Sequence, residues 1–82
     1  MIFVSRRYSE ARKLSKQGDY RKAEKLYRQA LQERNKKLGS DYFATLVSKY
    51  WLARTLCELK RDSEAEELFR QTLQQREKTL GT

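Results

Sequence analysis

Residues 23–40 read AEKLYRQALQERNKKLGS, and residues 65–82 read AEELFRQTLQQREKTLGT. The two stretches align without a gap at an offset of 42 residues, and 11 of the 18 aligned positions are identical. Self-similarity at a period of about 20–50 residues is typical of repeat arrays, in which each repeat is one supersecondary unit. We therefore expect two copies of one unit, at about residues 1–39 and about residues 40–82. The same offset pairs residues upstream: Tyr8 with Tyr50, Ala11 with Ala53, Arg12 with Arg54 and Leu14 with Leu56.

The composition indicates helices joined by short connections. The chain has 82 residues, no proline, only three glycines and 37% charged residues, whereas strand-rich chains use more turn and β-branched residues. A chain this short forms one small domain, which we expect to span residues 1–82 and to be all-α. No apolar run approaches the ~20 residues of a membrane span, and residues 1–4 are too short for a signal-peptide core. These features predict a soluble, cytoplasmic protein without membrane contact.

The first half of the chain predicts two helices separated by a glycine. Val4, Tyr8, Ala11 and Leu14 share one face of a helix at about residues 3–17. Gly18 supplies a helix stop and Asp19 an N-cap for a second helix, at about residues 20–38, which Gly39 ends. The expected buried stripe of this second helix is Ala23, Leu26, Tyr27, Ala30, Leu31, the stem of Arg34, and Leu38.

The second half repeats this order. We expect a third helix at about residues 42–59, capped by Ser40-Asp41, and a fourth at about residues 63–80, where Ser63 and Glu66 fit a capping box. The third helix has two apolar stripes and should therefore be the most enclosed element. Its stripes are Leu46, Tyr50, Ala53 and Cys57, and Leu52, Leu56 and Leu59; the fourth helix should bury Ala65, Leu68, Phe69, Thr72, Leu73 and Leu80.

The motifs in these helices resemble the tetratricopeptide repeat. Gly18-Asp19-Tyr20 followed by Ala23, Tyr27, Ala30 and Leu31 carries the likeness, and Ala11 and Ala53 stand where that repeat needs a small residue. The 42-residue period and the helix endings at residues 34–39 and 76–81 resemble the longer repeats of the kinesin-light-chain type. The resemblance implies two stacked helix–turn–helix hairpins, a fragment of an α-solenoid. It also implies that the first helix of each hairpin lines a concave groove that binds a protein partner.

Three departures separate the chain from that pattern. Tyr42-Phe43 stands where a His-Pro dipeptide is usual, and Tyr50-Trp51 stands where paired asparagines are usual. In the kinesin-light-chain type those asparagines help to hold bound peptide, so the chain departs from that mode of contact. Lys60 replaces the turn glycine of the second unit, which predicts a small conformational cost or a looser turn.

Catalytic chemistry has little support in the sequence. The chain has no histidine, and its single cysteine, Cys57, has neither a histidine to activate it nor a second thiol for a metal. Glu64, Glu66 and Glu67 are explained by their place at a helix start. We therefore expect no enzymatic activity, no metal and no cofactor.

By the resemblance, ten positions face the groove. Those expected to bind a partner are Tyr8, Arg12, Lys16, Tyr50, Trp51 and Arg54. The other groove-facing positions are Ser5, Ser9, Val47 and Glu58. The Tyr-x-x-x-Arg spacing of both units places a ring and a guanidinium one turn apart on one helix face. Arginine offers a bidentate fork to carboxylates, and tyrosine offers rigid amphipathic surface. These positions predict a scaffold or adaptor module that binds an acidic peptide or protein. The structural alternative is that the tyrosines pack between helices and the arginines are solvated.

The sequence also allows two other functions, nucleic-acid binding and self-association. Residues 1–39 hold 12 Lys/Arg against 4 Asp/Glu, and Arg21, Lys25, Arg28 and Gln32 form a basic stripe that could meet nucleic-acid phosphates. The stripe is short and lacks interleaved aromatic residues, so we disfavour nucleic acid as the partner. Apolar stripes at the ends of the two units could also support self-association into a homo-oligomer.

Overall fold

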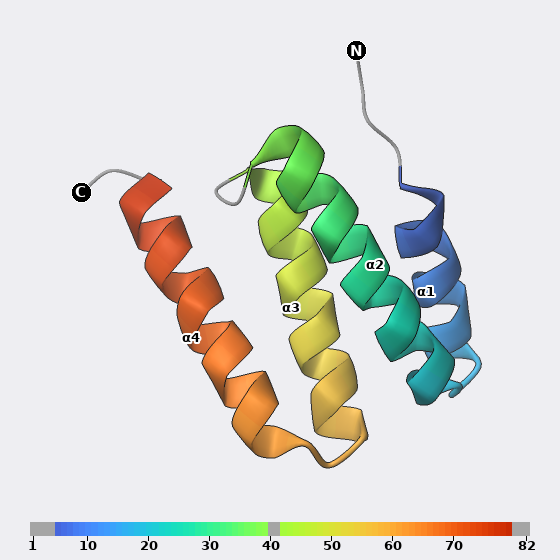
Figure 1. Cartoon of the computed structure of the whole chain (residues 1–82). Helices are drawn as coiled ribbons and strands as arrows, with labels where there is room; N and C mark the ends of the chain where they lie inside the picture. Colours follow the sequence, from blue (N-terminus) through green and yellow to red (C-terminus); the bar gives the residue numbers. More distant parts are fainter. Residues whose placement is uncertain (1–4, 40–41, 80–82) are drawn as a thin grey trace.

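The computed structural model describes residues 5–39 and 42–79 and folds them into four α-helices (Figure 1). They are α1 (Arg6–Lys16), α2 (Tyr20–Leu38), α3 (Phe43–Glu58) and α4 (Asp62–Thr79). Each helix packs against the next in sequence, so α2 contacts both α1 and α3, and α3 contacts both α2 and α4. The predicted all-α architecture of two helical hairpins is confirmed.

Small residues allow the helices to approach closely at the centre. The side chains of the central cluster are fully or almost fully buried: Ala11, Ala23, Tyr27, Leu52, Leu56 and Ala65. Helix α3 contributes more buried residues than any other described helix, as its two apolar stripes predicted. Helices α2 and α3 each pack against two neighbours, and the larger buried set of α3 makes it the most enclosed of the described helices.

The buried set of α3 nevertheless differs from the predicted one. Cys57 and Tyr50 are exposed, and Thr45, Ser48 and Thr55 are buried instead. Each of these hydroxyls donates to a backbone carbonyl at 2.8–3.1 Å, which removes the cost of burying it. A pattern based on hydrophobicity alone therefore misplaced the packed faces of this helix.

Further predictions from the sequence are wrong, and some concern residues outside the described ones. Leu73, predicted to be buried, is 57% exposed, because no described element covers its side of α4. Helix α4 begins at Asp62, so Ser63 lies inside the first turn and the predicted capping box is wrong. Helix α3 begins after Tyr42, which makes no side-chain cap. The predicted roles of Val4, of the Ser40-Asp41 cap and of Leu80 lie outside the described residues.

Arg34 is buried as a whole side chain, not only through its stem as predicted. It is 8% exposed, and its guanidinium carbon lies 4.2 Å from the centroid of the Tyr8 ring. Its Nη1 donates to the Ala44 carbonyl at 3.0 Å and to the Ser48 hydroxyl at 2.9 Å. Burial lowers the pKa of the Arg34 guanidinium. A single arginine thus joins α1 and α3 to its own helix, across the boundary between the two hairpins.

The first helix of each hairpin ends in the same turn. The residue after the helix cap has a positive φ in both, 85° at Gly18 and 64° at Lys60. A left-handed conformation suits glycine but is strained for a side chain with a Cβ. Two backbone hydrogen bonds of 2.9–3.0 Å close each turn. In the first turn, Asp19 N–H donates to the Leu14 carbonyl and Gly18 N–H to the Ser15 carbonyl. In the second turn, Arg61 N–H donates to the Leu56 carbonyl and Lys60 N–H to the Cys57 carbonyl.

We expect Lys60→Gly to stabilise the protein by about 0.5–1 kcal/mol, because it removes the strain of a left-handed lysine. Urea denaturation followed by circular dichroism measures the change. Gly18→Ala is the matched control and should destabilise the protein by a similar amount. An added Cβ at Gly18 meets no atom within 4 Å, so only backbone strain opposes it. A less stable Lys60→Gly variant would contradict the prediction.

Candidate functional site

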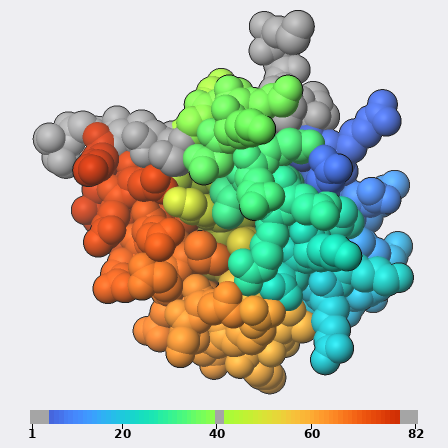
Figure 2. Space-filling model, viewed as in Figure 1, coloured from blue at the N-terminus to red at the C-terminus, as the bar shows by residue number. Residues whose placement is uncertain are grey.

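Helices α1 and α3, with the start of α2, line an open pocket of about 280 Å³. Four of the six predicted binding residues line it, namely Arg12, Lys16, Trp51 and Arg54. The other lining residues are Ser15, Tyr20, Thr55 and Glu58. Figure 2 shows a face formed mainly by α2 and α4, where α3 is visible only in the gap between them. The first helices of the two hairpins thus share the pocket, and the second helices supply most of the face in Figure 2.

Trp51 holds two arginine side chains in this pocket. The guanidinium carbon of Arg12 lies 3.9 Å from the centroid of the indole, and that of Arg54 lies 5.1 Å from it. A cation over an aromatic ring is attracted by its π electrons, at about 0.5–1 kcal/mol for an exposed pair and more for a buried one. Because the indole carries no charge, it positions the two guanidiniums without neutralising them.

The pocket keeps an unbalanced positive charge. It contains three cationic side chains, those of Arg12, Lys16 and Arg54, against the single carboxylate of Glu58. Across residues 5–39 and 42–79, none of the three cations forms an ion pair with a carboxylate. The free charge and the fixed guanidiniums suit an anionic group, because a carboxylate accepts two parallel hydrogen bonds from an arginine.

Tyr8 lies beneath the pocket and not in its lining. Its ring packs edge-on against Tyr27, at 6.0 Å between centroids, and under the guanidinium of Arg34. Its hydroxyl accepts a hydrogen bond from Nη1 of Arg12 at 3.3 Å. Tyr8 therefore packs between helices, which was the alternative to a role in binding, and it also helps to position Arg12. Ser5 likewise lies away from the pocket: it is buried, caps α1 and donates to Glu33.

Tyr50 lies beside the pocket on the exposed face of α3. Its ring contacts Trp51 and Phe69 edge-on, at 5.6 and 5.8 Å between centroids, and the residue is 41% exposed. Phe43 lies seven residues earlier, which places it on the same helix face, and it is 76% exposed. Phe43 was not among the predicted binding residues, although its seven-residue spacing from Tyr50 could have indicated it. The two rings extend the site by an apolar surface next to the cationic pocket.

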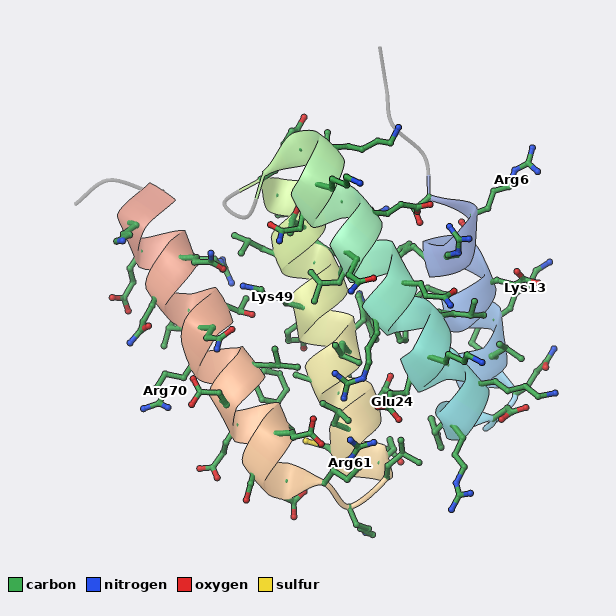
Figure 3. The ribbon with its side chains drawn as sticks, viewed as in Figure 1. Arg6, Lys13, Glu24, Lys49, Arg61 and Arg70 are labelled. Atoms are coloured by element: carbon green, nitrogen blue, oxygen red, sulfur yellow. The ribbon has the colours of Figure 1, made fainter. Side chains whose placement is uncertain are left out.

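The basic stripe on α2 is partly neutralised, in contrast to the pocket. Nε of Arg28 lies 2.8 Å from Glu24, and its Nη2 lies 3.0 Å from Glu64. Arg61 pairs with the same two carboxylates, and Figure 3 shows Glu24 and Arg61 close together between the hairpins. Hydrogen bonds from Arg28 and Arg61 hold the pKa of Glu64 below its usual value. Arg28 is thus engaged in joining α2 to α4, which weakens the case for phosphate binding by this stripe.

Other kinds of site find no support in the part of the chain that the structure covers. Within residues 5–39 and 42–79, no three His, Cys, Asp or Glu side chains gather as a metal would require. None of the helices described above is long and apolar enough to cross a bilayer.

Comparison with known proteins identifies the repeat. A family model described as a tetratricopeptide repeat matches residues 10–78, which cover parts of all four helices. No curated protein and no solved structure gives a significant match.

Proposed function

The chain belongs to the tetratricopeptide repeat family, and on this premise we propose that it binds an acidic segment of a partner protein between α1 and α3. Repeats of this family generally mediate protein–protein interactions and are not catalytic. The observation that carries the proposal is the cluster of Arg12, Arg54 and Trp51, whose charge no described carboxylate neutralises.

The fixed geometry of this cluster favours binding. Ordering a flexible arginine on association costs about 0.5–1.5 kcal/mol, and contacts with an indole already limit that freedom here. Two carboxylates of a bound segment could each accept hydrogen bonds from one guanidinium. Hydrogen bonds to charged groups contribute about 1.5–3 kcal/mol each, more than those between neutral groups. Acidic side chains near one another are therefore the expected feature of the ligand.

The exposed rings of Phe43 and Tyr50 add a second requirement. Phe43 and Arg54 are separated by 11 residues on one helix face, or about 16 Å at a rise of about 1.5 Å per residue. An extended peptide covers that distance in about five residues. The proposed ligand thus has an apolar side chain about five residues from its acidic cluster. It lies along α3, with the apolar residue near Phe43 and the acidic residues at the pocket.

Calorimetric titration with a synthetic peptide tests this proposal. The peptide contains one leucine, four serines and three successive aspartates, and a second peptide has asparagine in place of each aspartate. We expect Arg12→Ala/Arg54→Ala to weaken binding of the acidic peptide by at least ~10-fold, which corresponds to about 1.4 kcal/mol. The asparagine peptide should bind weakly to the unmodified protein.

Arg6→Ala/Lys13→Ala is the matched control. It removes the same charge from an exposed part of α1 outside the pocket, so it should change affinity less than ~2-fold at physiological salt. Equal losses in both double variants would show that net charge, and not the pocket, attracts the peptide. Unchanged affinity in Arg12→Ala/Arg54→Ala would overturn the proposal.

A further inference from the structure

The charge of the pocket between α1 and α3 corresponds to that of a doubly charged anion. Three cations line it, those of Arg12, Lys16 and Arg54, against the one carboxylate of Glu58, which leaves a net charge of about +2. An aspartate or glutamate side chain carries one negative charge, whereas a phosphorylated serine or threonine carries about −1.5 to −2 at pH 7. A single phosphate group therefore balances the charge of the pocket, which otherwise takes two acidic side chains.

The hydrogen-bond donors of the pocket also outnumber the acceptors of one carboxylate. A guanidinium has five N–H donors and an ammonium has three, whereas a carboxylate offers about four acceptor positions. Arg12 uses one donor on the Tyr8 hydroxyl, and the Arg54 guanidinium donates to no described residue. Both guanidinium carbons lie within 5.1 Å of the centroid of one indole, which brings them within reach of one anion. The three terminal oxygens of a phosphate can accept from both arginines at once.

A buried hydroxyl beside the pocket adds a further donor. Tyr27 is fully buried, and its hydroxyl has no hydrogen-bond partner among the described residues. Burial raises the pKa of Tyr27, while the nearby Ser15 hydroxyl and the charge of Arg12 oppose the rise. Ser15 also lines the pocket, so its hydroxyl can accept from Tyr27 and donate to an oxygen of a bound anion. An anion next to Ser15 thus favours a hydrogen bond for the buried hydroxyl of Tyr27.

We propose that the pocket binds a phosphorylated serine or threonine of the partner protein. This inference rests on the proposed function, because it names the group that occupies the same site. The pocket volume of about 280 Å³ agrees with one such side chain, since it lies below the roughly 300–1,000 Å³ of sites for drug-sized ligands. A nucleic-acid strand fits less well. Each of its phosphates carries a single charge, and the neighbouring basic stripe is partly neutralised at Arg28.

Calorimetric titration at pH 7.5 with three acetylated and amidated peptides tests the inference. Each peptide has one leucine and four serines, followed by phosphoserine and two asparagines, by two aspartates and one asparagine, or by serine and two asparagines. The first two peptides carry nearly the same charge, so a difference between them reports the phosphate group itself. We expect the phosphoserine peptide to bind at least ~10-fold more tightly than the aspartate peptide, and the uncharged peptide to bind weakly.

Lys16→Gln and Lys13→Gln form a matched pair of variants on α1. Each removes one charge, but Lys16 lines the pocket, whereas Figure 3 shows Lys13 extending away from the bundle. Lys16→Gln lowers the net charge of the pocket, so it should weaken binding of the phosphoserine peptide by about 5–10-fold. Lys13→Gln should weaken it less than ~2-fold at physiological salt. Equal losses in the two variants would show that the overall charge of α1 attracts the phosphate, and would overturn the inference.

The pH dependence of binding gives a second readout. The second pKa of phosphoserine is about 6, so most of the group is singly charged at pH 5.5. The charged and titratable groups that line the pocket are Arg12 and Lys16 from α1, Tyr20 from α2, and Arg54 and Glu58 from α3. The chain has no histidine, the side chain whose ordinary pKa lies in this range. Between pH 7.5 and 5.5 the phosphoserine peptide should lose about 3–4-fold in affinity, and the aspartate peptide less than ~1.5-fold. The same pH dependence for both peptides would contradict binding of the doubly charged form.

The outcomes separate this inference from the proposed function. If the phosphoserine and aspartate peptides bind equally and both lose affinity in Arg12→Ala/Arg54→Ala, the pocket takes acidic side chains and the phosphate inference is overturned. If neither peptide depends on these arginines, both proposals fail. Inorganic phosphate and a single-stranded DNA of eight nucleotides are the remaining probes. Binding of inorganic phosphate as tight as that of the phosphoserine peptide would assign the pocket to free phosphate, and tighter binding of the DNA would assign it to nucleic acid; either result would overturn the inference.

Discussion

Arg34→Ala should lower the free energy of unfolding by about 2–3 kcal/mol. The variant loses two hydrogen bonds from a charged donor, the contact of the guanidinium with the Tyr8 ring, and the packing of the arginine stem. It also leaves the Ser48 hydroxyl and the Ala44 carbonyl without this donor. Part of the loss is offset, because a buried charge no longer has to be taken out of water. Urea denaturation monitored by circular dichroism measures the difference.

The repeat supplies a control with the same chemical change. Arg76→Ala removes the equivalent residue of the second unit, which is exposed, and should alter stability by less than ~0.5 kcal/mol. Arg34→Met keeps most of the stem while it removes the charge and its hydrogen bonds, so it should fall between Arg34→Ala and the parent protein. Equal effects of Arg34→Ala and Arg76→Ala would show that the contact between the hairpins contributes little.

The helical fold could be predicted because local signals and the repeat agree. The glycine and aspartate between α1 and α2 act as stop and cap, as expected, and the 42-residue offset predicted the second hairpin. Helix ends were less predictable than the helices themselves. Helix α1 was expected from about residue 3 but begins at Arg6 after the cap Ser5, and α4 begins one residue earlier than expected, at Asp62. Lysine occupies the glycine position of the second hairpin. The strained Lys60 turn forms nonetheless, because the helices on both sides pack against each other.

Burial was harder to predict than secondary structure, since it depends on neighbouring units. Tyr8 and Tyr50 are equivalent, and each packs edge-on against the ring of the following helix, Tyr27 or Phe69. Tyr8 is nevertheless half-buried under Arg34, whereas Tyr50 is exposed on α3. Periodicity assigns both tyrosines to one helix face but contains no information on which helix covers it.

The candidate site combines a predictable and an unpredictable part. The positions of Arg12, Trp51 and Arg54 on the first helices followed from the resemblance, and the structure places all three around one pocket. A single indole contacts both guanidiniums because the fold brings α1 and α3 together at one pocket. The spacing of residues along either helix gives no information on that arrangement. Three lining residues were missed for the same reason, since they reach the pocket from the end of α1, the start of α2 and a buried position of α3: Ser15, Tyr20 and Thr55.

Leu56→Ala should have the largest effect of any single substitution considered for this protein, a loss of about 3–4 kcal/mol. Leu56 has no exposed surface and belongs to the central cluster, where α3 is covered by both neighbouring helices. Truncating a fully buried leucine removes its apolar transfer energy and leaves a cavity that the surrounding helices fill only in part. A domain of this size has a total stability of about 4–12 kcal/mol, so the variant should lose a large share of it.

Leu14→Ala provides the comparison, because Leu14 is the equivalent residue in the first repeat and is only half-buried. Helix α1 packs mainly against α2, so the space left by its leucine is open to relaxation and to water, and the loss should be about 1–2 kcal/mol. If Leu56→Ala unfolds the protein at 25 °C, Leu56→Val keeps the comparison measurable, with an expected loss of about 1 kcal/mol. Equal losses at the two leucines would contradict the central role of α3. A larger loss at Leu56 would show that two equivalent residues differ in energetic weight because one helix has two neighbours and the other has one.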